Sequence, residues 1–253
     1  MAEWFERFFD GLYARVLPRS WDDARSLDQA RIVKRLLGLR KGQGCLDVPC
    51  GMGRLTIPLA RMGLRMTGAD LTASYLAKGH RLARRAGVAI RWVQSDMRDI
   101  AFNAEFDAAF NWFGSFGYFS DADTLRFCRR IFAALRPGGR FLIEGVNLSW
   151  IRTHFRPDDD RTIGGVRIIS RNRWQDAAAG RIASTWTFCR GKATERHVIR
   201  MRMFSGATLR ELLQAAGFRD IRLYPNPPVG RFTRHSRRIV AVATKPRQAR
   251  RRP

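Results

Sequence analysis

The sequence lacks the features of several protein classes. Its four cysteines contain no CxxC pair, so we expect reduced thiols rather than a zinc site or a disulfide framework. The longest stretch without a charged residue, 108–120, has thirteen residues, fewer than the roughly 20 apolar residues of a membrane-spanning helix. The first residues are acidic and aromatic, unlike a signal peptide. These absences predict a cytoplasmic protein without a metal centre or membrane contact.

Lysine is scarce as well, with five residues against 42 arginines, although the chain carries 47 basic and 22 acidic residues and a net charge of +25. The excess of basic residues is spread widely along the chain. We therefore favour the explanation that the genome is biased toward arginine codons. Between residues 219 and 253, however, eleven basic residues accompany a single acid, Asp220. Nucleic-acid binding through this basic C-terminal region therefore stays open.

Hydrophobic periodicity predicts an α/β fold in which a smaller sheet is inserted. Between residues 43 and 146, short apolar runs alternate with amphipathic segments, the pattern of βαβ units and a parallel sheet. After residue 147 the period changes to that of three antiparallel strands, and a helix and two further strands follow. We expect a doubly wound, Rossmann-like sheet. The chain should consist of five parts: an N-terminal helical lid (1–40), a ligand-binding core (41–147), an inserted antiparallel three-stranded sheet (148–206), the C-terminal part of the core (207–244) and a basic tail (245–253).

A glycine-rich turn after the first strand of the core is the most informative segment. Gly51 and Gly53 let the main chain approach a ligand closely, and a helix begins directly after them. The G-x-G-x-x-G pattern of dinucleotide-binding proteins is incomplete, since Thr56 stands in the third glycine's place. Asp47, before the turn, would repel a pyrophosphate. A nicotinamide-dependent dehydrogenase is thus a weak alternative.

Polar residues follow the next three strands at their carboxyl ends. Asp70 stands seventeen residues after the second glycine, where a carboxylate can accept hydrogen bonds from both ribose hydroxyls. Asp96 is placed to accept from an adenine amino group while Met97 covers the ring, and Asn111-Trp112 follows the fourth strand. Each acid alone would equally suit a helix N-cap. Together, and without a phosphate-binding lysine, they indicate S-adenosylmethionine.

Residues 41–144 resemble the class I S-adenosylmethionine-dependent methyltransferases. Asp47-x-x-Cys50-Gly51-x-Gly53 is similar to their first motif, although Pro49 departs from it, and Asp70, Asp96-Met97 and 135–139 match later ones. The resemblance implies a seven-stranded sheet whose last strand, 238–244, runs antiparallel. It also implies that S-adenosylmethionine is held by Asp47, Pro49, Cys50, Gly51, Gly53, Asp70, Leu71, Asp96, Met97, Asn111 and Trp112.

Within that class, the inserted sheet and the run 113–118 resemble small-molecule enzymes such as sugar N-methyltransferases and glycine N-methyltransferase. In those enzymes the N-terminal segment lends an aromatic residue near the methyl group, which makes Tyr13 the first catalytic candidate and Tyr118 the second. His154 and His235 are further candidate bases. We expect the acceptor to contact three residues beyond the fifth strand: Asn147, Trp150 and Arg152.

The function that these features predict is methyl transfer from S-adenosylmethionine to a nitrogen or oxygen nucleophile of a small molecule. Two alternatives stay open, an RNA methyltransferase and a cofactor-binding assembly factor without turnover. Asn226-Pro227-Pro228 resembles the signature of methyltransferases that modify amide or base nitrogens. It stands after the penultimate strand rather than the fourth, so we predict a turn.

Overall fold

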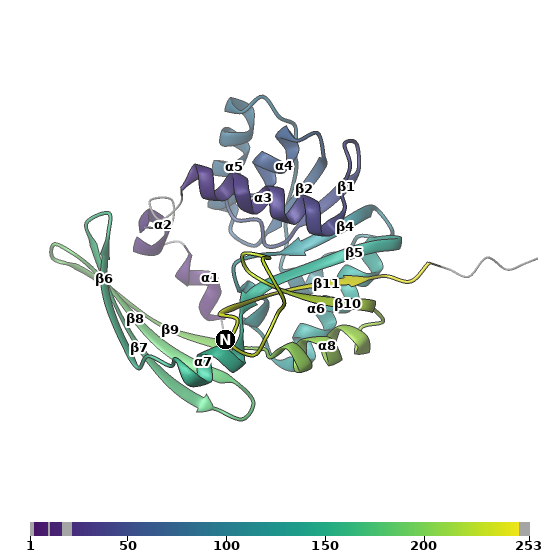
Figure 1. Cartoon of the computed structure of the whole chain (residues 1–253). Helices are drawn as coiled ribbons and strands as arrows, with labels where there is room; N and C mark the ends of the chain where they lie inside the picture. Colours follow the sequence, from purple (N-terminus) through teal and green to yellow (C-terminus); the bar gives the residue numbers. More distant parts are fainter. Residues whose placement is uncertain (1–2, 10, 17–21, 248–253) are drawn as a thin grey trace, which may run out of the picture.

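The fold is taken from a computed structural model that describes residues 3–9, 11–16 and 22–247. Its centre is a seven-stranded sheet of order β10-β11-β5-β4-β1-β2-β3 (Figure 1). The strands are β1 (Gly44–Asp47), β2 (Arg65–Asp70), β3 (Arg91–Gln94), β4 (Phe106–Asn111), β5 (Leu135–Val146), β10 (Arg219–Pro225) and β11 (Arg238–Thr244). Strands β1 to β5 pair in parallel, and β11 runs antiparallel to both neighbours. The predicted fold class is confirmed.

Helices cover both faces of this sheet. Consecutive residues of β1, Cys45 and Leu46, are fully buried in different hydrophobic clusters, as expected of a parallel strand that is covered on both sides. One cluster contains residues of α3 and the other contains residues of α6 and α8. The helices are α3 (Asp23–Leu37), α4 (Thr56–Arg61), α5 (Ala73–Arg85), α6 (Asp121–Ala134) and α8 (Gly206–Ala215).

The order of the strands creates a switch point between β1 and β4. Strand β1 pairs in parallel with β2 on one side and with β4 on the other. Connections that leave two adjacent strands for opposite faces of a sheet open a crevice at the strands' carboxyl ends, and ligands of such folds bind there. The residues after β1, β2, β3 and β4 therefore meet at one edge.

The inserted sheet has four strands, so the prediction of three was wrong in number. They are β6 (Asp158–Ile163), β7 (Val166–Asp176), β8 (Arg181–Arg190) and β9 (Ala193–Arg202), all antiparallel. Strand β6 was missed because its sequence, DDDRTI, has no apolar alternation. It is an edge strand that pairs with β7 alone, held by main-chain hydrogen bonds and by the ion pair between Arg167 and Asp160.

The N-terminal helices lie between the two sheets (Figure 1). Helix α1 (Trp4–Phe8) and helix α2 (Leu12–Val16) contribute Phe8 and Leu12 to a cluster with residues of the inserted sheet, whereas Phe5 packs into the core. A further short helix, α7 (Leu148–Thr153), leads from β5 into the inserted sheet. The lid is therefore attached to both parts of the chain.

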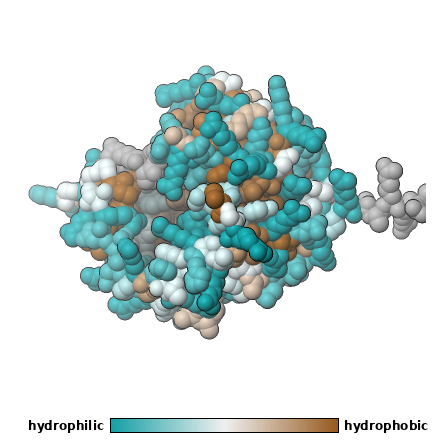
Figure 2. All heavy atoms as spheres, in the orientation of Figure 1, coloured by the Kyte–Doolittle hydropathy of each residue, from teal (hydrophilic) through white to brown (hydrophobic). Residues whose placement is uncertain are grey.

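The surface in Figure 2 is mostly hydrophilic, with hydrophobic side chains interspersed. Within the described ranges, no helix combines the length and the apolar character that crossing a membrane requires. In the predicted basic tail, Lys245 donates hydrogen bonds to the carbonyls of Phe132 and Leu135, both at 2.7 Å, and so anchors the end of β11 to the core. The rest of the predicted tail from Gln248 onward lies outside the described residues.

Candidate functional site

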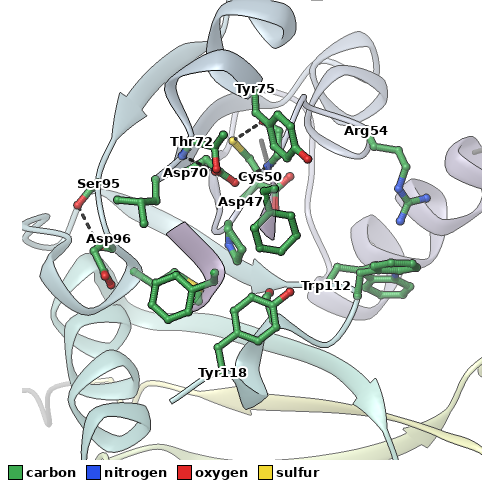
Figure 3. A pocket seen from close by; sticks show the side chains of 18 of the residues that line it. Asp47, Cys50, Arg54, Asp70, Thr72, Tyr75, Ser95, Asp96, Trp112 and Tyr118 are labelled. Atoms are coloured by element: carbon green, nitrogen blue, oxygen red, sulfur yellow. Dashed lines mark hydrogen bonds between the residues drawn. The ribbon is translucent and has the colours of Figure 1, made fainter. Parts of the chain in front are cut away.

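A cavity opens at the edge where β1, β2, β3 and β4 end (Figure 3). It encloses about 990 Å³, including the open solvent at its mouth. The lining comes from the four strand ends and the N-terminal helices: Phe5, Phe9, Tyr13, Asp47, Pro49, Cys50, Gly51, Arg54, Leu55, Asp70, Leu71, Thr72, Tyr75, Ser95, Asp96, Met97, Trp112, Phe113, Ser115, Tyr118 and Phe119.

Of the eleven residues expected to hold the cofactor, all but Gly53 and Asn111 line this cavity. A Cβ on Gly53 would come within 2.7 Å of the Trp92 ring, and its φ is +84°, so packing and backbone conformation both require glycine there. Asn111 is fully buried, and its Nδ2 donates to the carbonyl of Val48 at 2.9 Å. Asn111 therefore joins the ends of β4 and β1 beneath the cavity.

The Asp70 carboxylate is fixed at the end of β2 by two main-chain donors. Its Oδ2 accepts from the N–H of Gly51 at 2.7 Å, and its Oδ1 accepts from the N–H of Thr72 at 2.9 Å. Burial raises the pKa of Asp70, and these donors oppose the rise. The bond to Gly51 couples the glycine turn to β2. Because each carboxylate oxygen has a second acceptor site, a ligand's hydroxyl groups can still bind.

Asp96 both caps a short helix and faces the cavity. Its Oδ1 accepts from the N–H of Arg98 at 2.8 Å, and its Oδ2 accepts from the guanidinium of the same residue at 2.7 Å. Burial pushes the pKa of Asp96 upward, but the bonds from Arg98 outweigh it and hold the pKa below its usual value. The carboxylate is therefore ionised at neutral pH.

Asp47 lines the cavity and is 3% exposed. Burial raises its pKa to about 8, with Asp70 adding to the rise, although Thr56 donates to its Oδ2 at 2.6 Å and Arg54 also opposes it. At neutral pH this carboxyl group is mostly protonated. A cation bound next to it would favour the ionised form.

The two tyrosine candidates also line the cavity. Burial raises the pKa of Tyr13 to about 12, with Arg161 opposing, and raises the pKa of Tyr118 further above its ordinary value. Both phenols thus keep their protons at neutral pH. They can donate a hydrogen bond to an acceptor but are poor general bases.

The residues expected to contact the acceptor do not reach this cavity. Asn147 is fully buried, caps α7 and donates to the carbonyl of Ser236 at 2.9 Å. Arg152 donates to the carbonyls of Ala177 and Ala178 at 3.0 and 2.8 Å. Trp150 stacks on His154 with ring centroids 4.3 Å apart.

Trp150 and His154 line a second cavity, under the inserted sheet, of about 1,580 Å³ including its mouth. Trp186 and Arg237 also line it. Trp186 packs edge-on against Tyr13 at a centroid distance of 6.4 Å, so these two rings stand between the two cavities. His235 is exposed and lines neither cavity.

Arg54 and Phe113 are among the lining residues that were not predicted as site residues. Arg54 follows the second glycine of the turn directly, and this adjacency was the available signal. Phe113 is 55% exposed and has a φ of +79°, unusual for a residue with a side chain. Its N–H donates to the fully buried carboxylate of Glu144 at 3.0 Å, which holds this conformation.

Comparison with known proteins agrees with this geometry. Residues 45–139 match a family model described as a methyltransferase domain. The matched segment makes up less than half of the chain. The ubiquinone/menaquinone biosynthesis C-methyltransferase of Pectobacterium atrosepticum is 32% identical to the chain over 131 residues, which is 48% of this chain and 51% of that protein. The chain spans about half or less of the length of the curated relatives it matches.

Solved structures of class I methyltransferases share the whole fold. An S-adenosylmethionine-dependent methyltransferase of Clostridium acetobutylicum gives a TM-score of 0.77 at 17% identity, over 94% of this chain and 98% of that one. An amino pentose methyltransferase of Micromonospora echinaspora, solved with S-adenosylmethionine bound, gives 0.66 at 22% identity over the same shares. At such low identities the likeness shows the fold. The likeness in fold includes the inserted sheet and the N-terminal helices, because it extends over 94% of the chain.

Proposed function

We propose that this chain is an S-adenosylmethionine-dependent methyltransferase that acts on a nitrogen or oxygen nucleophile of a small molecule. One observation carries the proposal. Asp70 and Asp96, at the ends of neighbouring strands, face a single cavity together with the turn at Gly51. Two oriented carboxylates suit the hydroxyl and amino groups of an adenosine. The domain match and the bound cofactor of the amino pentose enzyme support the same cofactor.

The structure also argues against a dinucleotide in this cavity. Thr56, which replaces the third glycine, is fully buried and bonded to Asp47. At this position dinucleotide-binding proteins have a glycine, which allows the helix and the strand to pack closely. In this chain the position carries a side chain that contacts Asp47.

S-Adenosylmethionine supplies a methyl group that its sulfonium has already activated. The protein's task is then to align the acceptor with the methyl–sulfur bond and to exclude water. Tyr13 and Tyr118 serve this purpose by donating hydrogen bonds from phenols that stay protonated. The aromatic rings of the lid, Phe5 and Phe9, cover the cavity.

We further propose that the acceptor binds in the second cavity, whose lining comes mainly from α7 and the inserted sheet. There Trp150 and Arg237 offer an aromatic face and a cation to part of a small molecule. Tyr13 lines the first cavity and its ring contacts that of Trp186, which lines the second, and this contact supports a role for Tyr13 between acceptor and cofactor. Domain roles follow from this: lid 1–40 and sheet 148–206 hold the acceptor, and the core holds the cofactor.

Titration calorimetry tests the proposal. The isolated protein should bind S-adenosylmethionine and S-adenosylhomocysteine but not NAD. Transfer of a labelled methyl group to fractions of a metabolite extract should then identify the acceptor. Total RNA is tested in parallel as the alternative acceptor. Binding of NAD without a response to S-adenosylhomocysteine would refute the assignment. Labelling of RNA alone would show that the methyl acceptor is RNA and not a small molecule.

A further inference from the structure

A hydrogen bond between distant parts of the chain joins the second N-terminal helix to the inserted sheet. Oε2 of Glu195, on β9, accepts from the N–H of Leu12, the first residue of α2, at 2.7 Å. The main chain before Leu12 comes equally close, because a Cβ on Gly11 would lie 2.9 Å from Cδ of Glu195 and nearer still to Oε2. The absence of a side chain at residue 11 therefore makes room for the carboxylate.

Strand β9 reaches both N-terminal helices from one face. Residues two apart on a strand point to the same side of the sheet. His197, two residues after Glu195, packs edge-on against Phe8 of α1 with ring centroids 5.5 Å apart, and its Nε2 lies 3.8 Å from Oε2 of Glu195. The strand thus contacts α1 through a ring and α2 through a carboxylate.

The hydrogen bond adds direction to apolar packing. Phe8 and Leu12 lie in one hydrophobic cluster with Phe188 and Ile199 of the inserted sheet. Hydrophobic burial is non-directional, whereas a hydrogen bond requires a defined distance and angle. Helix α2 has five residues, fewer than the roughly 12–15 that an isolated helix needs even to be marginally stable. Its orientation therefore depends on tertiary contacts, of which the bond from Leu12 to Glu195 is a directional one.

Tyr13 directly follows Leu12, so its position depends on the main chain that Glu195 holds. The Tyr13 ring lines the first cavity and contacts the ring of Trp186, which lines the second. Glu195 itself lines neither cavity. Its effect on a ligand must therefore pass through the residues that it holds in place.

We propose that Glu195 is a positioning residue for methyl transfer, because it fixes the main chain at Leu12 and thereby the phenol of Tyr13. The inference rests on the proposed function, in which Tyr13 orients the acceptor. Loss of the hydrogen bond should shift Tyr13 and leave the strand ends that hold the cofactor in place. A displacement of about 1 Å in a group that aligns reactants can lower a rate by about 100-fold.

Two substitutions of Glu195 test this role. Glu195→Leu removes both acceptor oxygens at similar volume, whereas Glu195→Gln keeps one of them. Methyl transfer to the metabolite fraction that takes up the label should slow by roughly 10- to 100-fold in Glu195→Leu, and Glu195→Gln should retain most of the rate. The affinity for S-adenosylhomocysteine, measured by calorimetry, should stay nearly the same in both variants.

A measurement without acceptor or cofactor follows the hydrogen bond itself. Amide hydrogen exchange in a peptide that contains residues 11–16 should quicken in Glu195→Leu and stay close to that of the unaltered protein in Glu195→Gln. Glu211→Leu makes the same replacement at an exposed position on α8 and should change neither exchange nor turnover. A double variant, Tyr13→Phe with Glu195→Leu, should be no slower than the slower of its two single variants, because both changes act on one phenol.

The outcomes separate the possible failures. Losses that multiply in the double variant would show that Glu195 and Tyr13 act independently and would overturn the inference. An unchanged rate in Glu195→Leu, a Glu195→Gln variant that is equally slow, or a parallel loss of S-adenosylhomocysteine affinity would overturn it as well. If Glu195→Leu does not fold, Gly11→Ala, which crowds the carboxylate away from Leu12, is measured in its place.

The proposed function can fail separately. If the unaltered protein transfers no methyl group to any fraction, the proposed function is overturned, and the role of Glu195 in methyl transfer with it. Unchanged hydrogen exchange in Glu195→Leu would overturn the inference alone, whatever the protein methylates.

Discussion

Replacing Asp47 by Asn removes a carboxyl group that folding transfers from water into the interior. In the folded protein burial raises its pKa to about 8, whereas in an unfolded chain an aspartate titrates near pH 3.9. Between these two values the folded state holds one more proton than the unfolded state. The free energy of unfolding therefore falls as pH rises through this window.

The size of the effect follows from the two pKa values. Each pH unit inside the window costs about 1.4 kcal/mol. Relative to Asp47→Asn, the unaltered protein should thus lose about 3 kcal/mol between pH 5 and pH 7. The loss starts near pH 4 and is complete near pH 8, where the carboxyl group is ionised in both states.

Urea unfolding followed by tryptophan fluorescence at pH 5, 6 and 7 measures the difference for both proteins. Histidines and other groups titrate in both proteins alike, so their contributions largely cancel in the comparison. The Asn variant should gain stability over the unaltered protein as pH rises and should bind S-adenosylhomocysteine less tightly. A stability difference that is the same at all three pH values would refute the account of Asp47 as a buried, protonated carboxyl group.

Three other predictions address the site and the tail. Asp70→Asn should weaken S-adenosylhomocysteine binding by about 1–3 kcal/mol, since it removes the charge from its hydrogen bonds; an unchanged affinity in the folded variant would take Asp70 out of the site. Tyr13→Phe should lower turnover of the identified acceptor while cofactor affinity stays the same, as for an interaction made mainly in the transition state; full activity would make Tyr13 structural. Deleting Gln248 to Pro253 should leave cofactor affinity and turnover unaltered, and a salt-sensitive loss of RNA binding would instead favour the RNA alternative.

The sequence predicted the core well because the signals there are local. Apolar runs separated by amphipathic segments specify a parallel sheet covered on both faces, and both the sheet and its antiparallel last strand were confirmed. The acids Asp70 and Asp96 could be placed because strands of a parallel sheet end at one edge. Their common cavity follows from that rule.

Segments without hydrophobic periodicity were predicted less well from the sequence. Strand β6 is polar and lies at an edge, so its pairing depends on β7, a partner that hydrophobic alternation does not reveal. Asn147, Trp150 and Arg152 follow a strand end as the cofactor residues do, yet their side chains do not reach the first cavity. Asn147 caps α7, Trp150 lines the second cavity, and Arg152 bonds to the carbonyls of Ala177 and Ala178. A position after a strand fixes where the main chain lies, not where a side chain points.

The amino-acid sequence by itself therefore determined the sheet, its insertion and the carboxylates of the cofactor edge. These depend on spacing along the chain and on the rules of parallel strands. Only the tertiary structure decided that Asp47 is buried enough to hold a proton, that Glu195 reaches the main chain of α2, and that Tyr13 stands between two cavities. Burial and side-chain direction arise from segments far apart in the sequence, and no local pattern encodes them.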